Sequence, residues 1–149
     1  TVSNESTHGA IDQETRDKFV AVAREASRAA YAPCSRFRVG AALLCSDGTV
    51  MPGANVENRS YGLAICAERS AIGAAVTAGH QDFVAIAVYS PDADYPVSPC
   101  GACRQVISEF MKSDGVVIFA DRAGGVETHT IEEILPFDAL HELRDRPVV

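Results

Sequence analysis

Two short runs in the sequence, FVAIAVYS at 83–90 and GVVIFAD at 115–121, are almost wholly apolar. A strand with one solvated face alternates apolar and polar side chains, and these runs do not alternate. Each run therefore fits a strand that is covered on both faces. Helical patterns precede the two runs, from about Cys66 to Gly79 and from about Gly101 to Met111. Helix and strand thus alternate along this part of the chain, which is typical of a sheet between layers of helices.

The N-terminal third predicts a helix and then a β-hairpin. Apolar side chains recur at helical spacing over residues 12–30, and Pro33 ends that pattern. Residues 37–57 contain two β-compatible runs around the turn SDG. Pro52 and Gly53 break the second run, so we expect this strand at a sheet edge or at a bulge.

The C-terminal part predicts a weak strand near residues 126–130, followed by a short helix. Thr130 and Glu133 have the spacing of a capping box for that helix. Together these elements predict one α/β domain over residues 1–149, with a mixed sheet of about five strands between helices. Residues 1–11 are polar and predict a flexible N-terminal tail.

Composition narrows the functions that this chain can have. Its 149 residues are 47% hydrophobic, which is enough apolar mass for one core. The formal net charge of −7 argues against nucleic-acid partners, because these are usually bound by clustered Lys and Arg. No apolar run approaches the ~18 residues of a membrane span, and the N-terminus does not resemble a secretion signal. We therefore expect a cytoplasmic protein without a membrane or nucleic-acid partner.

The five cysteines point to metal or thiol chemistry. Their number is odd, which argues against a complete disulfide framework. Cys66 lies at one predicted helix start, and Cys100 and Cys103 lie at another. A helix N-terminus lowers the pKa of a thiol, and the thiolate is the form that binds metals. The C-x-x-C spacing can place two sulfurs on one side of a helical turn, with the third supplied by the other helix.

A metal held by three cysteines would keep one coordination position open. Structural zinc normally takes four protein ligands, and no histidine lies beside a cysteine at ligand spacing. Water in an open position on zinc has a pKa lowered towards ~7. Glu68, two residues after Cys66, could then handle its proton, while Arg69 and the helix ends offset the thiolate charge.

Less specific interpretations remain open at this point. A C-x-x-C pair alone is also typical of redox sites or of half a structural zinc site. A structural zinc-binding module is therefore the non-enzymatic alternative, and it predicts that Glu68 is dispensable. The joint pattern of C-A-E at one helix start and P-C-x-x-C at the next corresponds to the zinc-deaminase signature, with Cys66 in place of the usual histidine.

Three segments, FRVGAALL, NVENRSYGLAICAERSAI and SPCGACRQVI, closely resemble the small zinc-dependent cytidine deaminases, and the likeness extends from the first helix to EEILP. The resemblance implies the three-layer α/β/α fold of that family. It also implies one Zn²⁺ per chain on Cys66, Cys100 and Cys103. Glu68 would be the proton shuttle, and Arg69 would donate hydrogen bonds to the ligand thiolates.

The resemblance further implies how a nucleoside is held. Asn55 and Glu57 would bind the ribose 3′-hydroxyl, and Phe37 would line the base and sugar pocket. The backbone N–H of Ala67 would bind the base. Asn55 and Glu57 alternate along a strand end, so both side chains can point to one side.

Family members of this short, triple-cysteine type resemble homotetramers with shared active sites. Tyr61 matches a residue that reaches a neighbouring site, and Phe137 is the candidate for covering the base from another subunit. Three residues depart from the family pattern: Cys34 in place of an aromatic residue, Arg38 in place of a small residue or proline, and Arg59 in place of a small residue. We expect Arg59 to alter recognition near the 5′ end of the nucleoside.

The leading prediction is hydrolytic deamination of free cytidine and 2′-deoxycytidine to uridine and 2′-deoxyuridine, with release of ammonia, in pyrimidine salvage. The alternative substrate is a modified cytosine nucleoside, as in the blasticidin S deaminases, although the intact NVEN motif argues against it. Deaminases of polynucleotides are disfavoured by the acidic charge.

Overall fold

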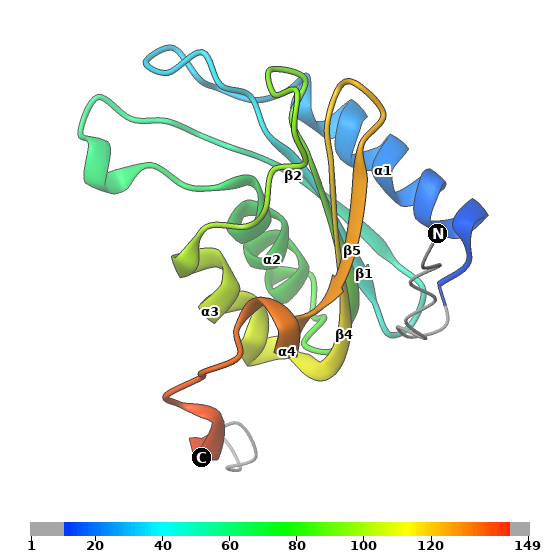
Figure 1. Cartoon of the computed structure of the whole chain (residues 1–149). Coiled ribbons are helices and arrows are strands. Elements are labelled where there is room, and N and C mark those ends of the chain that lie inside the picture. Colours follow the sequence, from blue (N-terminus) through cyan, green and yellow to red (C-terminus); the bar gives the residue numbers. More distant parts are fainter. Residues whose placement is uncertain (1–10, 144–149) are drawn as a thin grey trace.

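A computed structural model describes residues 11–143 and contains one five-stranded sheet (Figure 1). Its strand order is β2-β1-β3-β4-β5. The parallel pair is β3 with β4, and the other neighbours are antiparallel, so the sheet is mixed as predicted. The strands are β1 Gly40–Cys45, β2 Val50–Ala54, β3 Phe83–Tyr89, β4 Met111–Ala120 and β5 Val126–Thr130.

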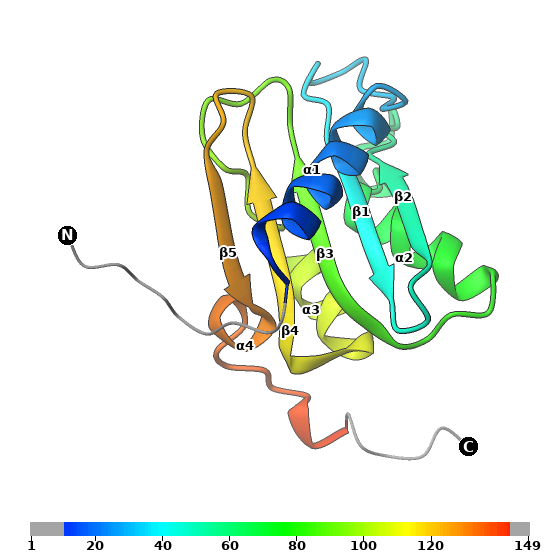
Figure 2. The ribbon, with the colours of Figure 1, turned by 90° about the vertical axis from the view of Figure 1, so that its right-hand side faces the viewer.

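Helices cover both faces of this sheet, which confirms the three-layer prediction. Helix α1 lies on one face and the other α-helices lie on the opposite face (Figures 1 and 2). No helix within residues 11–143 is long and apolar enough to cross a membrane. The helices are α1 Gln13–Ser27, α2 Ala67–Thr77, α3 Gly101–Phe110 and α4 Ile131–Ile134, with the 3₁₀-helices η1 Tyr61–Leu63 and η2 His141–Leu143.

The central strand β3 is almost wholly apolar because helices cover both of its faces. Ala85 and Ala87 point to the side of α1 and pack in a cluster with Phe19. Ile86 and Val88 point to the other side and pack with α2. Because both faces are covered, no position in the middle of the strand needs a polar side chain. The small side chains on the α1 side let that helix approach the sheet closely.

Most predicted boundaries are confirmed by the caps. Cys66 is the N-cap of α2, and Gly79 follows its end with φ of 98°, the left-handed conformation that favours glycine. The Thr130 side chain accepts a hydrogen bond from the Glu133 N–H, as the capping pattern predicts. Strand β2 lies at the sheet edge, as predicted. Pro52 has no backbone N–H, and an edge strand tolerates this because one of its sides pairs with no other strand.

Two boundaries differ from the prediction. Helix α1 ends at Ser27 rather than near residue 30, because the next amides bond three residues back and tighten the last turn. Strand β4 begins at Met111 rather than Gly115, with an irregular register against β3. The tail predicted over residues 1–11 lies outside the described residues except for Ile11, which packs against the α1 side of the core.

Gly40 gives a direct test of the packing between α1 and β1. A Cβ built on Gly40 would overlap the backbone of Ala23 and Ser27 in α1. We expect Gly40→Ala to lower the free energy of unfolding by about 2–3 kcal/mol or more, because the clash is with rigid helix backbone. Urea denaturation measures this loss.

Gly73→Ala is the matched control. Gly73 lies in the middle of α2, and a Cβ there meets nothing within 4 Å. This substitution should leave stability unchanged or raise it by up to about 1 kcal/mol, since alanine favours the helix. Equal effects of the two substitutions would contradict the close α1–β1 packing.

Candidate active site

The structure brings the sulfurs of Cys66, Cys100 and Cys103 together at two neighbouring helix N-termini. Cys66 is the N-cap of α2 and Cys100 is the N-cap of α3. The three Sγ atoms all lie within 4.8 Å of one another, and Cys66 Sγ is 3.8 Å from Cys100 Sγ. The Cys103 N–H donates to Cys100 Sγ at 3.4 Å, which fixes the C-x-x-C turn.

This donor set fits zinc. With Zn–S bonds of about 2.3 Å, two sulfurs of a tetrahedral site are about 3.8 Å apart, and the distance from Cys66 Sγ to Cys100 Sγ has that value. All five cysteines are free. The three clustered cysteines therefore offer a three-thiolate site that leaves room for one further ligand.

Arg69 supplies the positive charge next to the sulfurs. Its guanidinium donates to Cys66 Sγ at 3.5 Å. The pKa of the Cys66 thiol is lowered to about 5 by hydrogen bonds from Cys103 and then from Arg69 and Cys100. An ionised Cys66 in turn raises the pKa of the Cys103 thiol. Without a cation the cluster cannot ionise fully, so it has the electrostatics of a cation site.

Glu68 is buried beside the sulfurs. Its side chain belongs to the first turn of α2, and the residue is 3% exposed. Burial and, after it, the charge of Cys66 raise the pKa of this carboxyl to about 7. Ala67, between Cys66 and Glu68, is fully buried, and its N–H is among the first helix amides, which have no acceptor within the helix.

Asn55 joins two parts of the predicted sugar site. Its Oδ1 accepts the Val39 N–H at 2.8 Å, and its Nδ2 donates to the Phe37 carbonyl at 2.9 Å. Phe37 is half-buried in the segment that Asn55 holds. These bonds use one of the two amide hydrogens of Asn55, so the other stays available to a ligand.

Glu57 and Tyr61 line one pocket. Glu57 Oε1 accepts the N–H groups of Cys34 and Ser35 at 2.9 and 3.1 Å. The Ser35 side chain, and after it these two backbone bonds, lower the pKa of the Glu57 carboxyl. The pocket has a volume of about 360 Å³ and includes Cys34, Glu57 and Tyr61. Tyr61 is 79% exposed, and Arg59 in the same loop is also exposed.

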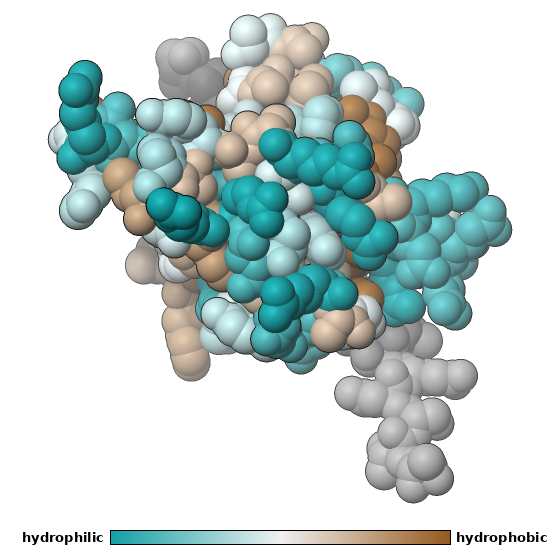
Figure 3. Space-filling view, turned by 90° about the horizontal axis from the view of Figure 1, so that it is seen from above, coloured by the Kyte–Doolittle hydropathy of each residue, from teal (hydrophilic) through white to brown (hydrophobic). Residues whose placement is uncertain are grey.

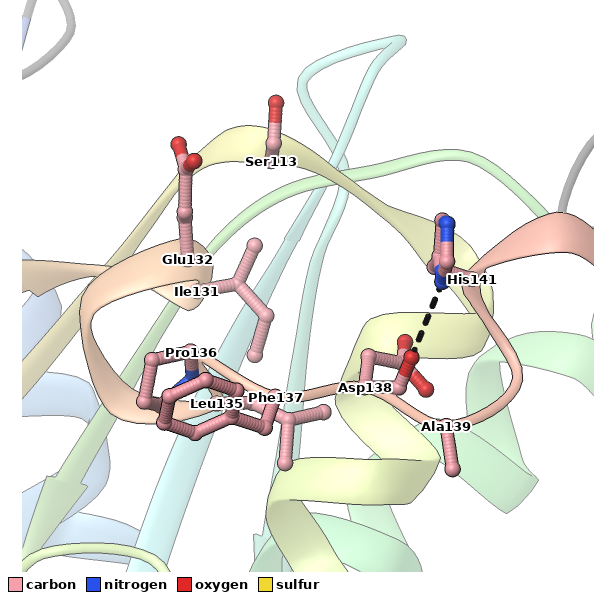
Figure 4. A pocket seen from close by; sticks show the side chains of 9 residues that line it. All are labelled: Ser113, Ile131, Glu132, Leu135, Pro136, Phe137, Asp138, Ala139 and His141. Atoms are coloured by element: carbon pink, nitrogen blue, oxygen red, sulfur yellow. Dashed lines mark hydrogen bonds between the residues drawn. The ribbon is translucent and has the colours of Figure 1, made fainter.

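Phe137 does not line the pocket of Glu57 and Tyr61. It lines a different pocket of about 560 Å³, formed mainly by α4 and the segment after it (Figure 4). Its ring is 92% exposed. The dashed contact in Figure 4 is His141 Nδ1 to the Asp138 carbonyl, at 3.1 Å, which folds this segment over. None of the clustered cysteines lines this pocket. Within one chain, therefore, Phe137 is not brought to the sulfurs.

Two positioning contacts could not be predicted from the sequence. Arg104 donates from Nε to the Pro99 carbonyl and from a terminal nitrogen to the Ile134 carbonyl, at 2.9 and 3.2 Å. It thus ties the end of α4 to the residue before Cys100. The only sequence signal was an arginine directly after Cys103, which does not identify its acceptors.

The second contact is a clamp between Arg38 and Asp92. Asp92 accepts from the Arg38 N–H and Nε at Oδ2 and from a terminal nitrogen at Oδ1, at 2.9, 3.0 and 2.8 Å. The clamp joins the segment of Phe37 to the loop that leads to Cys100.

The face seen in Figure 3 is largely hydrophilic, with apolar side chains scattered over it.

Known proteins match this chain over the part that carries the clustered cysteines and Glu68. Residues 13–120 match the family model described as the cytidine and deoxycytidylate deaminase zinc-binding region. A cytidine deaminase of Halalkalibacterium halodurans is 49% identical over 81% of this chain and 91% of its own length. A blasticidin-S deaminase of Bacillus cereus is 35% identical over 68% and 76%. The crystal structure of cytidine deaminase from Burkholderia pseudomallei has a TM-score of 0.79 at 44% identity, covering 82% of this chain and 97% of that one.

The Asp92 clamp predicts local protection of the Arg38 amide. Asp92→Ala removes the acceptor of this N–H, so its hydrogen exchange should become about 10-fold faster. Asp94→Ala is the control, because Asp94 pairs with the Arg122 side chain on the same rim and accepts from no described backbone amide. NMR measures the exchange rate of the Arg38 amide in both variants. The clamp is contradicted if both substitutions speed this exchange, or if neither does.

The same clamp predicts a response to acid. Arg38 lowers the pKa of Asp92 from 3.8 to about 2. Because the folded-state pKa is the lower one, the stabilisation is fully present above about pH 4 and is lost as pH falls through about 2. Arg38 protection in the wild-type protein should therefore persist at pH 4 and decline towards pH 2. Loss of protection already between pH 5 and 4 would contradict the assignment.

Proposed function

This chain belongs to the cytidine and deoxycytidylate deaminase family, and on that premise we propose that it hydrolytically deaminates free cytidine and 2′-deoxycytidine. The products are uridine and 2′-deoxyuridine, with ammonia released. The observation that carries the proposal is the cluster of three cysteine sulfurs with the buried Glu68 carboxyl beside it. A purely structural metal site has no use for a buried carboxyl that is free of the metal.

Cys66, Cys100 and Cys103 would hold the zinc ion. Bound there, zinc supplies a water molecule made acidic enough to act as a nucleophile at neutral pH. Arg69 stabilises the thiolates through its bond to Cys66 Sγ. The sulfurs stand at two helix N-termini, whose partial positive charge further offsets their negative charge.

Glu68 moves the protons of the reaction. Its carboxylate takes a proton from the attacking water and delivers it to N3 of the pyrimidine as the C4–O bond forms. Glu68 then takes the remaining proton from the added C4 hydroxyl and delivers it to the amino group, so that the C4–N bond breaks, the C4 carbonyl forms and ammonia leaves. Because burial disfavours its charged form, the carboxyl can both accept and donate a proton near neutral pH.

The sugar would bind at Asn55 and Glu57, with Phe37 against the base and sugar. Glu57 Oε1 is held by two backbone amides, which orients Oε2 to accept a sugar hydroxyl. Asn55 keeps one amide hydrogen for the same hydroxyl. The Ala67 N–H at the start of α2 would bind the base next to Glu68.

We further propose a homotetramer in which active sites are shared. Tyr61 and Phe137 are exposed aromatic side chains on a single chain, as expected of residues that reach a neighbour. Free thiols suit the reducing cytoplasm, where pyrimidine salvage takes place. Arg59 is exposed in the Tyr61 loop, and we propose that it affects recognition near the 5′ end of the nucleoside.

A modified cytosine nucleoside is the alternative substrate, supported by the similarity to blasticidin-S deaminase. The two substrates are distinguished by comparing kcat/KM for cytidine and for blasticidin S. A clear preference for blasticidin S would replace cytidine as the substrate while leaving the roles of the sulfurs and Glu68 intact.

Glu68→Gln tests the proton shuttle. The amide has nearly the same shape but cannot carry the proton, so kcat for cytidine should fall by about 10⁴-fold or more. Zinc content and thermal stability should stay close to those of the wild-type protein. Glu109→Gln is the control, since Glu109 is exposed on α3. Undiminished turnover in Glu68→Gln would support the structural zinc module instead.

Glu57→Gln with 3′-deoxycytidine tests sugar recognition. A lost charged hydrogen bond is worth about 1.5–3 kcal/mol, so kcat/KM for cytidine should fall roughly 10–100-fold. The variant and the wild-type protein should then handle 3′-deoxycytidine about equally, because that substrate lacks the hydroxyl. An equal loss on both substrates would show that Glu57 acts only by holding Cys34 and Ser35 in place.

A further inference from the structure

A second group of metal-ligating side chains, Cys45, Asp47 and His80, lies away from the three clustered sulfurs. Their ligand atoms are all within 4.8 Å of one another. His80 Nδ1 is 3.4 Å from Asp47 Oδ2. We propose that these residues form a second transition-metal site of the zinc class, joining the β1–β2 turn to the end of α2.

The β1–β2 turn that carries two of these ligands is held rigidly by the backbone. The Cys45 N–H donates to the Thr49 carbonyl, and the Gly48 N–H donates back to the Cys45 carbonyl, at 2.9 and 3.0 Å. Ser46 N–H donates to the Asp82 carbonyl at 2.9 Å and ties the turn to the segment after α2. These bonds fix the backbone that carries Cys45 and Asp47.

The end of α2 fixes the third ligand. Gly79 has φ of 98°, and the His80 N–H donates to the Ala75 carbonyl at 2.9 Å, which closes the helix. This closure directs His80 towards Asp47. The C-terminal end of a helix carries partial negative charge, so a cation is favoured there.

The donor set selects the class of metal. One sulfur, one imidazole nitrogen and one carboxylate oxygen suit Zn²⁺ or Co²⁺, whereas Ca²⁺ and Mg²⁺ require oxygen ligands. Asp47 Oδ1 accepts the Thr49 N–H at 2.9 Å, which leaves Oδ2 for the ion. A thiolate and a carboxylate together carry two negative charges, and the imidazole is neutral. With a divalent cation bound, the site therefore has no net charge.

Access and burial also suit an ion that enters from solvent. The Asp47 side chain is 55% exposed and that of His80 is 23% exposed, while Cys45 is 2% exposed. Burial raises the pKa of the Cys45 thiol. Metal binding would displace this proton to solvent, so affinity should increase with pH.

This site is separate from the catalytic one proposed above. Cys66 caps the start of α2 and His80 follows its end, and the 11 residues of α2 between them span about 16 Å. An ion at the second site would cross-link the β1–β2 turn to the end of α2. Its expected effect is therefore on stability, and the inference does not depend on deaminase activity.

Metal stoichiometry tests the inference. The purified full chain is saturated with ZnCl₂, freed of loosely bound metal by gel filtration, and analysed by mass spectrometry for zinc per chain. We expect two zinc ions in the wild-type protein and one in Cys45→Ser and in His80→Ala. Cys34→Ser and His129→Ala, which remove a thiol and an imidazole outside the group, should keep two.

Thermal unfolding with added zinc provides a second readout. Zinc beyond the first equivalent should raise Tm of the wild-type protein and not of His80→Ala. Circular dichroism and retention of the first zinc show that the variant is folded, and His80→Ala decides the result if Cys45→Ser does not fold. One zinc ion in the wild-type protein, or two in folded His80→Ala, would overturn the inference and would leave an Asp47–His80 ion pair beside an ordinary buried thiol.

Discussion

The close approach of two helix N-termini is the constraint on which the rest of this structure depends. Helices α2 and α3 each precede one strand of the parallel pair β3 and β4. Because both helices run back along their strands, their N-termini meet at the same end of the sheet. Cys66 and Cys100 occupy the two N-cap positions, so the topology itself assembles the metal ligands. A structure with these strands antiparallel would separate the sulfurs.

Small residues make that approach possible. Gly53 in β2 has no side chain where a Cβ would overlap the backbone of α2 between Ala67 and Ala71. The edge strand can therefore lie against the first turns of α2, and Asn55 and Glu57 follow directly after it. The same contact brings the sugar-binding candidates near the helix that carries Cys66. Packing, charge and site geometry are in this way consequences of one arrangement.

The sequence predicted those features that depend on local patterns. The covered strands, the helix caps at Cys66 and Gly79, and the edge position of β2 all follow from a few neighbouring residues. The contacts that it did not predict join residues far apart in the chain. Arg38 and Asp92 are separated by 54 positions, and no local pattern identifies such partners. His80 likewise reaches Cys45 and Asp47 only through the fold. Early tightening of α1 was missed because alanines near its end favour a longer helix.

The central claim is that three cysteine sulfurs and Glu68 together form a metal-dependent deaminase site. The most direct measurement is the ultraviolet absorbance change of cytidine with the purified chain, before and after removal of metal by a chelator and after return of zinc. The account predicts rapid conversion to uridine, its loss on metal removal, and its recovery when zinc again occupies the cluster. Full activity of the metal-free protein, or a zinc-loaded protein that deaminates no cytosine nucleoside, would contradict it.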